Sequence, residues 1–102
     1  MQKLLIIQSG PSSKHARQIK TLFSESILNN ERVQVYLIGE GVAWMNTELW
    51  DLIYNPNVTF YANAIDANRH GIPFSTDIIF SSKASLEQLK SGADRIIYIN
   101  TN

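Results

Sequence analysis

Cysteine is absent from this sequence of 102 residues. Without a thiol there is no disulfide framework, no zinc site of the cysteine-rich kind and no thiolate nucleophile. Histidine occurs only at His15 and His70, which disfavours a histidine-rich metal site as well. The sequence therefore predicts a protein with no metal site, and none of its patterns calls for a cofactor.

Long apolar runs are also missing. The longest runs contain only a few residues, whereas a transmembrane helix needs about 20. Residues 1–7 look like the start of a secretion signal, but the polar and turn-forming residues 8–11 end that run too early. We therefore expect no membrane partner, and a cytoplasmic location is the default prediction.

An excess of charge of either sign is missing too. The chain carries nine basic and nine acidic side chains and has a formal net charge of zero. Proteins that bind nucleic acids or anionic membranes usually carry a clear positive excess, so we expect no nucleic-acid partner. Hydrophobic residues make up 44% of the chain, which is ordinary for a packed globular protein. At this length we expect one domain, spanning residues 1–102.

What the sequence does contain is a regular alternation of strand and helix patterns. Strands are expected at residues 3–8, 33–38, 58–62 and 95–99, and helices at about 12–29, 42–54, 63–70 and 85–92. Two interpretations stay open for residues 72–81, which form either a loop or a short strand at 78–80. Such an alternation predicts an α/β fold with a mainly parallel sheet of about five strands, covered on both faces and flavodoxin-like in outline.

Ligands of parallel α/β sheets bind outside the carboxyl ends of the strands. The loops at residues 9–13, 39–41 and 62–66 follow three predicted strands, so we expect them to gather at that edge. Gly39 and Gly41 would permit a sharp turn and a close approach of other backbone. A functional site is expected among these loops.

Helix ends carry recognisable signals. Ser85 followed by Gln88 matches a capping box, which predicts that the last helix begins there. Gly71 is expected to stop the short third helix, and Pro73 would prevent it from resuming. In the second helix, Trp44 and Trp50 lie outside the main apolar stripe, and they are either core residues or a subunit interface.

Three segments together resemble the DsrE/TusD-like (DsrEFH-like) family of sulfur-relay proteins. These segments are the first strand ending in Ser9-Gly10, the turn Leu37-Ile38-Gly39-Glu40-Gly41-Val42, and the element Arg69-His70-Gly71-Ile72. The likeness covers nearly the whole chain. It implies a three-layer α/β/α domain that assembles as a homo-oligomer, with a trimer favoured and a hexamer possible, or that joins a sulfur-relay protein partner.

The resemblance also shows where the chain departs from the family. In relay members, a cysteine eight residues before the glycine of the last element carries a sulfane sulfur as a persulfide, and counting back from Gly71 gives Asn63. Only a thiolate can attack, hold and release a sulfur atom in this way. The chain therefore looks like a branch that lacks the persulfide cysteine and cannot carry sulfur itself.

Each candidate site residue has a structural and a functional interpretation. Asn63 is either the N-cap of the short helix or a ligand-orienting amide. Asp66 is either an acid favoured by the N-terminal end of the helix dipole or a second ligand contact. The candidate ligand-binding residues are Ser9, Gly10, Ser12, Gly39, Gly41, Asn63 and Asp66.

The turn after the first strand, with Ser9, Gly10 and Ser12, resembles a phosphate cradle in outline. It contains neither of the glycine-rich nucleotide motifs, so an ordinary capped turn is the simpler interpretation. His15 follows in the first turn of the predicted helix, as a surface residue or as a neutral acid/base group.

Three functions remain open at this stage. The first is a non-enzymatic, oligomeric protein that binds a small ligand or a partner at the carboxyl ends of the strands. The second is an accessory subunit of a sulfur-transfer system. The third and weakest is a small hydrolase or lyase that uses His15 and Asp66.

Overall fold

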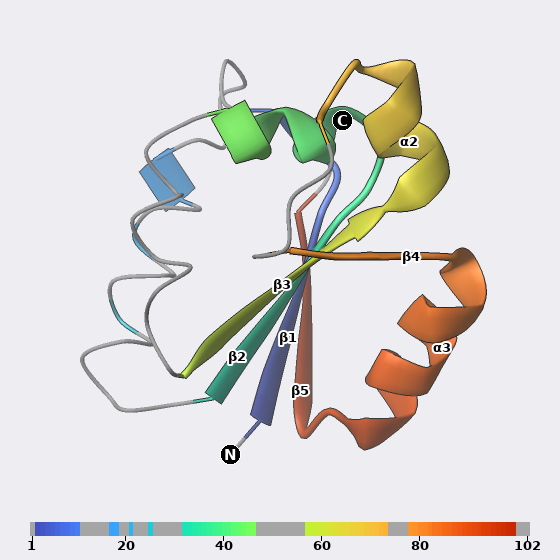
Figure 1. Ribbon diagram of the computed structural model, residues 1–102. Helices are drawn as coiled ribbons and strands as arrows, with labels where there is room; N and C mark the ends of the chain where they lie inside the picture. The colour runs from blue at the N-terminus through green and yellow to red at the C-terminus, as the bar shows by residue number, and fades with distance from the viewer. Residues whose placement is uncertain are drawn as a thin grey trace.

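The computed structural model describes residues 2–10, 17, 18, 21, 25, 32–46, 57–73 and 78–99. The elements with defined bounds are β1 (Gln2–Ile7), β2 (Arg32–Leu37), the 3-10 helix η1 (Gly39–Asn46), β3 (Val58–Asn63), α2 (Ala64–Arg69), β4 (Ile79–Ser81), α3 (Lys83–Gly92) and β5 (Arg95–Ile99). The five strands form one sheet in the order β4-β3-β2-β1-β5 (Figure 1), and each strand is parallel to its neighbours. The predicted α/β fold with a five-stranded parallel sheet is confirmed.

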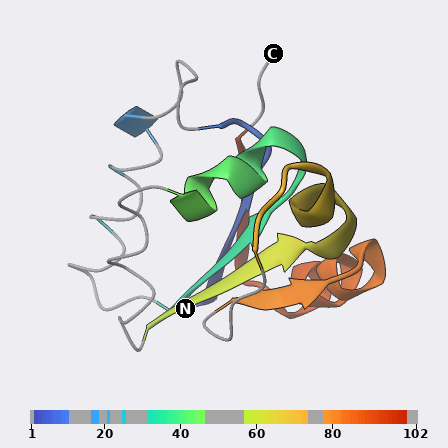
Figure 2. The ribbon, with the colours of Figure 1, turned by 45° about the horizontal axis from the view of Figure 1, so that its top comes forward.

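Helices cover both faces of this sheet. The turned view places η1 and α2 on one side of β3 and β4, and α3 on the other side (Figure 2). We call these two sides of the sheet the η1 face and the α3 face. None of the described helices is long and apolar enough to cross a membrane.

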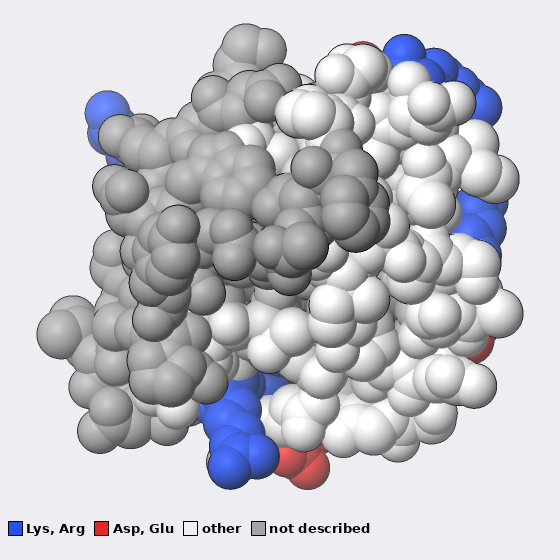
Figure 3. Space-filling model, in the orientation of Figure 1, with Lys and Arg blue, Asp and Glu red and all other residues white. Residues whose placement is uncertain are grey.

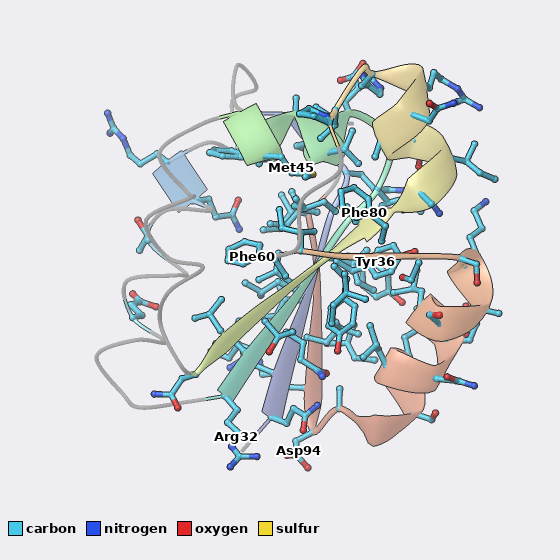
Figure 4. All side chains as sticks on the ribbon, viewed as in Figure 1. Arg32, Tyr36, Met45, Phe60, Phe80 and Asp94 are labelled. Atoms are coloured by element: carbon cyan, nitrogen blue, oxygen red, sulfur yellow. The ribbon has the colours of Figure 1, made fainter. Side chains whose placement is uncertain are left out.

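The strands send alternate side chains to the two faces, as the two-residue period of a strand requires. Buried residues of the η1 face come from all the long strands and from the covering helices; they include Leu5, Ile7, Val33, Val35, Leu37, Val42, Trp44, Met45, Phe60, Ala62, Ala67 and Ile99. The smaller cluster of the α3 face contains Leu4, Ile6, Tyr36, Ile38 and Leu86. Phe60 and Tyr36 accordingly lie on different sides of the sheet (Figure 4).

The turn after β2 needs its two glycines for different reasons. Gly39 adopts a φ of +58°, a left-handed conformation that favours glycine. At Gly41 an added Cβ would collide with the Ile7 carbonyl group, because η1 passes directly over the end of β1. The expected sharp turn and close backbone approach are both confirmed.

Two helix starts differ from the sequence prediction. Helix α3 begins at Lys83 with Ser82 as its N-cap, and the Ser85 N–H donates to the Ser82 carbonyl oxygen at 3.1 Å. The capping-box prediction at Ser85 is therefore wrong, because the end of β4 runs directly into the helix. Helix η1 begins at Gly39, three residues before the predicted start at Val42, because the left-handed Gly39 begins to wind the chain immediately after β2.

Some of the remaining predictions are confirmed, and others fall on residues that the structure does not describe. Of the two interpretations of residues 72–81, the strand is confirmed as β4, whereas residues 74–77 lie outside the described residues. The final strand is confirmed at Arg95–Ile99. The four described residues of the predicted helix at 12–29 are helical, and residues 47–54 of the predicted second helix lie outside the described residues.

Trp44 is a core residue. It is 1% exposed within the single chain, and its Nε1–H donates to the Ser9 carbonyl oxygen at 2.7 Å. Of its two interpretations, core and subunit interface, the structure supports the core. Trp50 lies outside the described residues, and the trimer implied by the resemblance stays a prediction.

Candidate functional site

A pocket of about 600 Å³ opens at the carboxyl ends of the first four strands. Its walls come from the turns after β1 and β2, from the end of β3 with helix α2, and from the junction of β4 with α3. The lining residues are Gln8, Ile38, Gly39, Asn63, Ala64, Ile65, Asp66, Arg69, Ser81, Ser82 and Lys83. The structure therefore brings the loops at 39–41 and 62–66 together at one site.

The candidate residues from the sequence divide into three groups. Gly39, Asn63 and Asp66 line this pocket. Ser9, Gly10 and Gly41 are described but do not line it, and the Ser9 carbonyl oxygen is occupied by Trp44. Ser12 lies outside the described residues.

Asn63 forms the N-cap of α2, as one interpretation of the sequence predicts. Its backbone is extended, with φ −64° and ψ 122°, and its Oδ1 accepts a hydrogen bond from the Asp66 N–H at 3.1 Å. Its Nδ2 donates to the Tyr36 hydroxyl at 3.5 Å, and the residue is only 4% exposed. Both polar atoms of the amide thus have protein partners, while the side chain still forms part of the pocket wall.

Asp66 ties α2 to the turn after β2. Its Oδ2 accepts a hydrogen bond from the Gly39 N–H at 2.8 Å, and its Oδ1 lies 3.7 Å from a guanidinium nitrogen of Arg69. The side chain is 15% exposed, so this carboxylate mainly holds the left-handed turn against the helix. His15, the other residue of the hydrolase or lyase hypothesis, lies outside the described residues.

Tyr36 lies beneath the pocket residues Asn63 and Ser82 and forms hydrogen bonds with both. It was not among the site residues predicted from the sequence. Its ring is fully buried, and its hydroxyl donates to the Ser82 carbonyl oxygen at 3.0 Å. The same hydroxyl accepts from Asn63, so Tyr36 connects the N-cap of α2 with the N-cap of α3. The alternation along β2 could have placed Tyr36 on the face opposite Val35, but its hydrogen-bond partners Asn63, Ser81 and Ser82 are 27 to 46 residues away in the chain.

The two basic residues of the pocket were also not predicted from the sequence. Lys83 and Arg69 line it, and Lys83 has no acidic partner among the described residues. Figure 3 shows Lys or Arg atoms over α2 and between α2 and α3, separated by uncharged surface. The sequence does indicate Lys83, because this residue follows the polar residues Ser81 and Ser82 at the end of β4. The prediction that the helix begins at Ser85 left Lys83 out of the candidate site.

Two buried hydroxyl groups lack hydrogen-bond partners within the described part of the chain. These are Ser9 Oγ and Ser81 Oγ, and Ser81 is one of the pocket residues. The described residues contain no group of three or more His, Cys, Asp or Glu side chains that could hold a metal ion. The polar groups at the pocket are therefore amides, hydroxyls and two cations around a single carboxylate.

Comparison with known proteins identifies the fold. No protein-family model matches the sequence, and no curated protein matches it. Among solved structures, the crystal structure of the YchN protein from E. coli matches with a TM-score of 0.75 and 15% sequence identity, covering 96% of this chain and 99% of that chain. At this identity the likeness shows the fold alone. The chain therefore shares its parallel α/β fold with this structure, and membership of the DsrE/TusD-like family stays a prediction from the sequence.

Proposed function

We propose that this chain is a non-enzymatic protein that binds a small molecule in the pocket at the carboxyl ends of β1 to β4. The pocket itself carries this proposal. Its volume of about 600 Å³ falls within the range of roughly 300–1,000 Å³ that is usual for small-molecule sites. It also lies at the edge of the sheet where parallel α/β folds bind their ligands.

The state of the polar side chains argues for binding rather than catalysis. A nucleophilic mechanism needs a hydroxyl, thiol or amine within hydrogen-bond reach of a base. Among the described pocket residues no serine hydroxyl is hydrogen-bonded to a base, and the sole carboxylate, on Asp66, is engaged by Gly39 and Arg69. The pocket offers a shaped surface with positioned polar groups.

A fragment screen followed by two-dimensional amide NMR tests this proposal. Fragments that bind should shift the amide signals of Gly39, Asn63 and Ser82 together, because these residues lie on three different pocket walls. The variant Ala64→Trp should abolish these shifts, because Ala64 is an exposed residue of the pocket wall and the larger ring would fill the space.

Ala84→Trp is the matched control. Ala84 is likewise exposed at the start of a helix, but it does not line the pocket. This variant should bind fragments as the unmodified chain does. Shifts scattered over the whole surface, or unchanged in Ala64→Trp, would contradict the proposal.

A second candidate is an accessory role in sulfur transfer. The fold supports it, as does the location of Asn63 in the pocket wall, where the resemblance places the relay cysteine. In this role the chain would dock to a cysteine-bearing relay protein while carrying no sulfur itself. Calorimetric titration with such a protein tests it: binding that Ala64→Trp weakens and Ala84→Trp does not would support docking at the pocket, and no binding would remove it.

A further inference from the structure

We propose that the pocket selects small organic anions, whose carboxylate or phosphate group is held by Lys83, Arg69 and the open N-terminus of α3. This inference rests on the proposed function, because it names the ligand class of the same pocket. It depends on three features of the wall between α2 and α3: the charge balance, the unused hydrogen-bond donors and an apolar surface.

The charge balance of the pocket is positive. Arg69 and Lys83 supply two cations, and Asp66 supplies the single carboxylate. Asp66 already accepts the Gly39 N–H at 2.8 Å and lies 3.7 Å from Arg69, so its charge is met within the protein. The Arg69 side chain is nevertheless 71% exposed, and Lys83 is exposed with no acidic partner in the described ranges. An anion that enters the pocket could therefore form ion pairs with both cations.

Two hydrogen-bond donors at the start of α3, the N–H groups of Lys83 and Ala84, have no acceptor among the described residues, whereas the Ser85 N–H donates to the Ser82 carbonyl oxygen. This helix has ten residues, and its N-cap Ser82 makes no side-chain cap hydrogen bond. The first N–H groups of a helix have no intrahelical acceptors, and they carry the positive end of the helix dipole. Because Ser82 and Lys83 line the pocket, these N–H groups lie at its wall.

The hydroxyl of Ser81 gives an independent indication. Its oxygen is buried, lacks a partner among the described groups and belongs to a residue of the same wall. Buried polar groups are nearly always satisfied by protein, water or ligand. Because the Ser81 Oγ is closed to solvent in this conformation, an anionic oxygen at the start of α3 would accept from this hydroxyl after the side chain rotates toward the pocket.

The apolar part of the wall distinguishes an organic anion from an inorganic one. Ile38, Ala64 and Ile65 line the pocket, and Ile65 is 70% exposed although it is a large apolar residue. A pocket of about 600 Å³ is far larger than a sulfate or phosphate ion needs. A ligand with an apolar body could cover Ile65 while its charged end reaches Lys83.

Three probes of similar shape test the inference: benzoate, its neutral analogue benzamide, and phenyl phosphate. Each is titrated into the full chain at low salt and followed by the amide signals of Asn63, Ala64 and Ser82. We expect at least one of the two anions to bind roughly threefold to tenfold more tightly than benzamide, the effect of a charge-assisted hydrogen bond. Comparison of the two anions identifies which anionic group the wall prefers.

Charge-removing variants locate the effect. Lys83→Gln and Arg69→Gln should each reduce the preference for the anion over benzamide, and the double variant should abolish it. Lys90→Gln is the matched control, because it removes a lysine from the last turn of the same helix, away from the pocket. This control should keep the full preference.

The possible failures are distinguishable. If benzamide and the anions shift the pocket signals with equal affinity, the anion inference is overturned and the proposed binding function stands. If no probe shifts these signals, the inference is overturned and the proposed function loses its support too. If inorganic phosphate binds as tightly as phenyl phosphate, the apolar wall does not contact the ligand, and the preference for organic anions is overturned.

Discussion

The two faces of the sheet are built from the same five strands but from different chemistry. On the η1 face, β2 and β3 present only apolar side chains, such as Val35, Phe60 and Ala62. On the α3 face the neighbouring positions carry hydrogen-bonding groups, among them Tyr36 and Tyr61, whose rings stack with their centroids 6.5 Å apart. Adjacent residues of one strand thus belong to two different environments.

The two faces therefore have different roles: one mainly stabilises the fold, and the other positions the pocket. The η1 face buries a continuous apolar cluster, whereas the α3 face contains two short hydrogen-bond chains. One runs from Gln2 through Gln34 to Tyr61, and the other from Asn63 through Tyr36 to Ser82. The second chain ends at the pocket wall, so the polar face positions the pocket while the apolar face supplies most of the burial.

The largest predicted effect is the removal of a large side chain from the η1 face. Trp44→Ala should lower the free energy of unfolding by about 4–5 kcal/mol, because it leaves a cavity and an unpaired Ser9 carbonyl group. Leu86→Ala, on the α3 face, should cost about 2 kcal/mol. Urea denaturation of both variants measures the difference, and equal losses would contradict the separation of the faces.

Glycine substitutions should give opposite signs at two positions. Gly41→Ala should destabilise the chain by about 2–3 kcal/mol, because its Cβ would meet the Ile7 carbonyl group and the backbone would have to shift. Gly92→Ala, at the end of α3, meets nothing within 4 Å, and it should be neutral or stabilise by up to about 0.5 kcal/mol. Melting temperatures of the two variants test this, and a tolerated Gly41→Ala would show that η1 does not pack as closely on β1 as described.

The polar network should respond to the loss of one hydroxyl group. Tyr36→Phe should cost about 1–2 kcal/mol, because the Asn63 Nδ2 loses its acceptor and the Ser82 carbonyl oxygen loses one of its hydrogen bonds. Tyr61→Phe is the control. Among the described residues, the half-buried Tyr61 hydroxyl makes a single long hydrogen bond, at 3.5 Å, and its loss should cost less than about 0.5 kcal/mol. The amide signal of Ser82 should shift in Tyr36→Phe but not in Tyr61→Phe. An unchanged Ser82 signal in Tyr36→Phe would show that Tyr36 does not position the pocket wall.

The features that the sequence predicted correctly are the local ones. Short apolar runs located the strands, and the residue types predicted the Asn63 N-cap and the end of the short helix at Gly71, where the structure has a φ of +68°. The features that it did not predict join distant parts of the chain. The Asp66–Gly39 hydrogen bond spans 27 residues and the Tyr36–Ser82 hydrogen bond 46. Such pairs depend on which strands are neighbours, and that information is absent from any single segment.

The smallest predicted effect concerns the outer edge of the α3 face, where Lys90 lies over the exposed Tyr98 ring, 5.6 Å from its centroid. A hydrogen bond to Tyr98, followed by one to Glu87, raises the pKa of the Lys90 ammonium above the ordinary value of 10.5. Because the raised pKa belongs to the folded state, the contribution to stability is fully present below pH 10.5 and is lost as the pH rises through the folded-state pKa.

The comparison that tests this effect is between the unmodified chain and Lys90→Met, which keeps the apolar stem and removes the charge. The difference in melting temperature should be small and constant from neutral pH upward, and it should vanish in strongly alkaline solution. In a Tyr98→Phe background the difference should be smaller from the start, because the largest cause of the raised pKa is removed. A difference that persists at alkaline pH would mean that Lys90 acts through the packing of its stem, which would make this edge of the α3 face resemble the apolar η1 face.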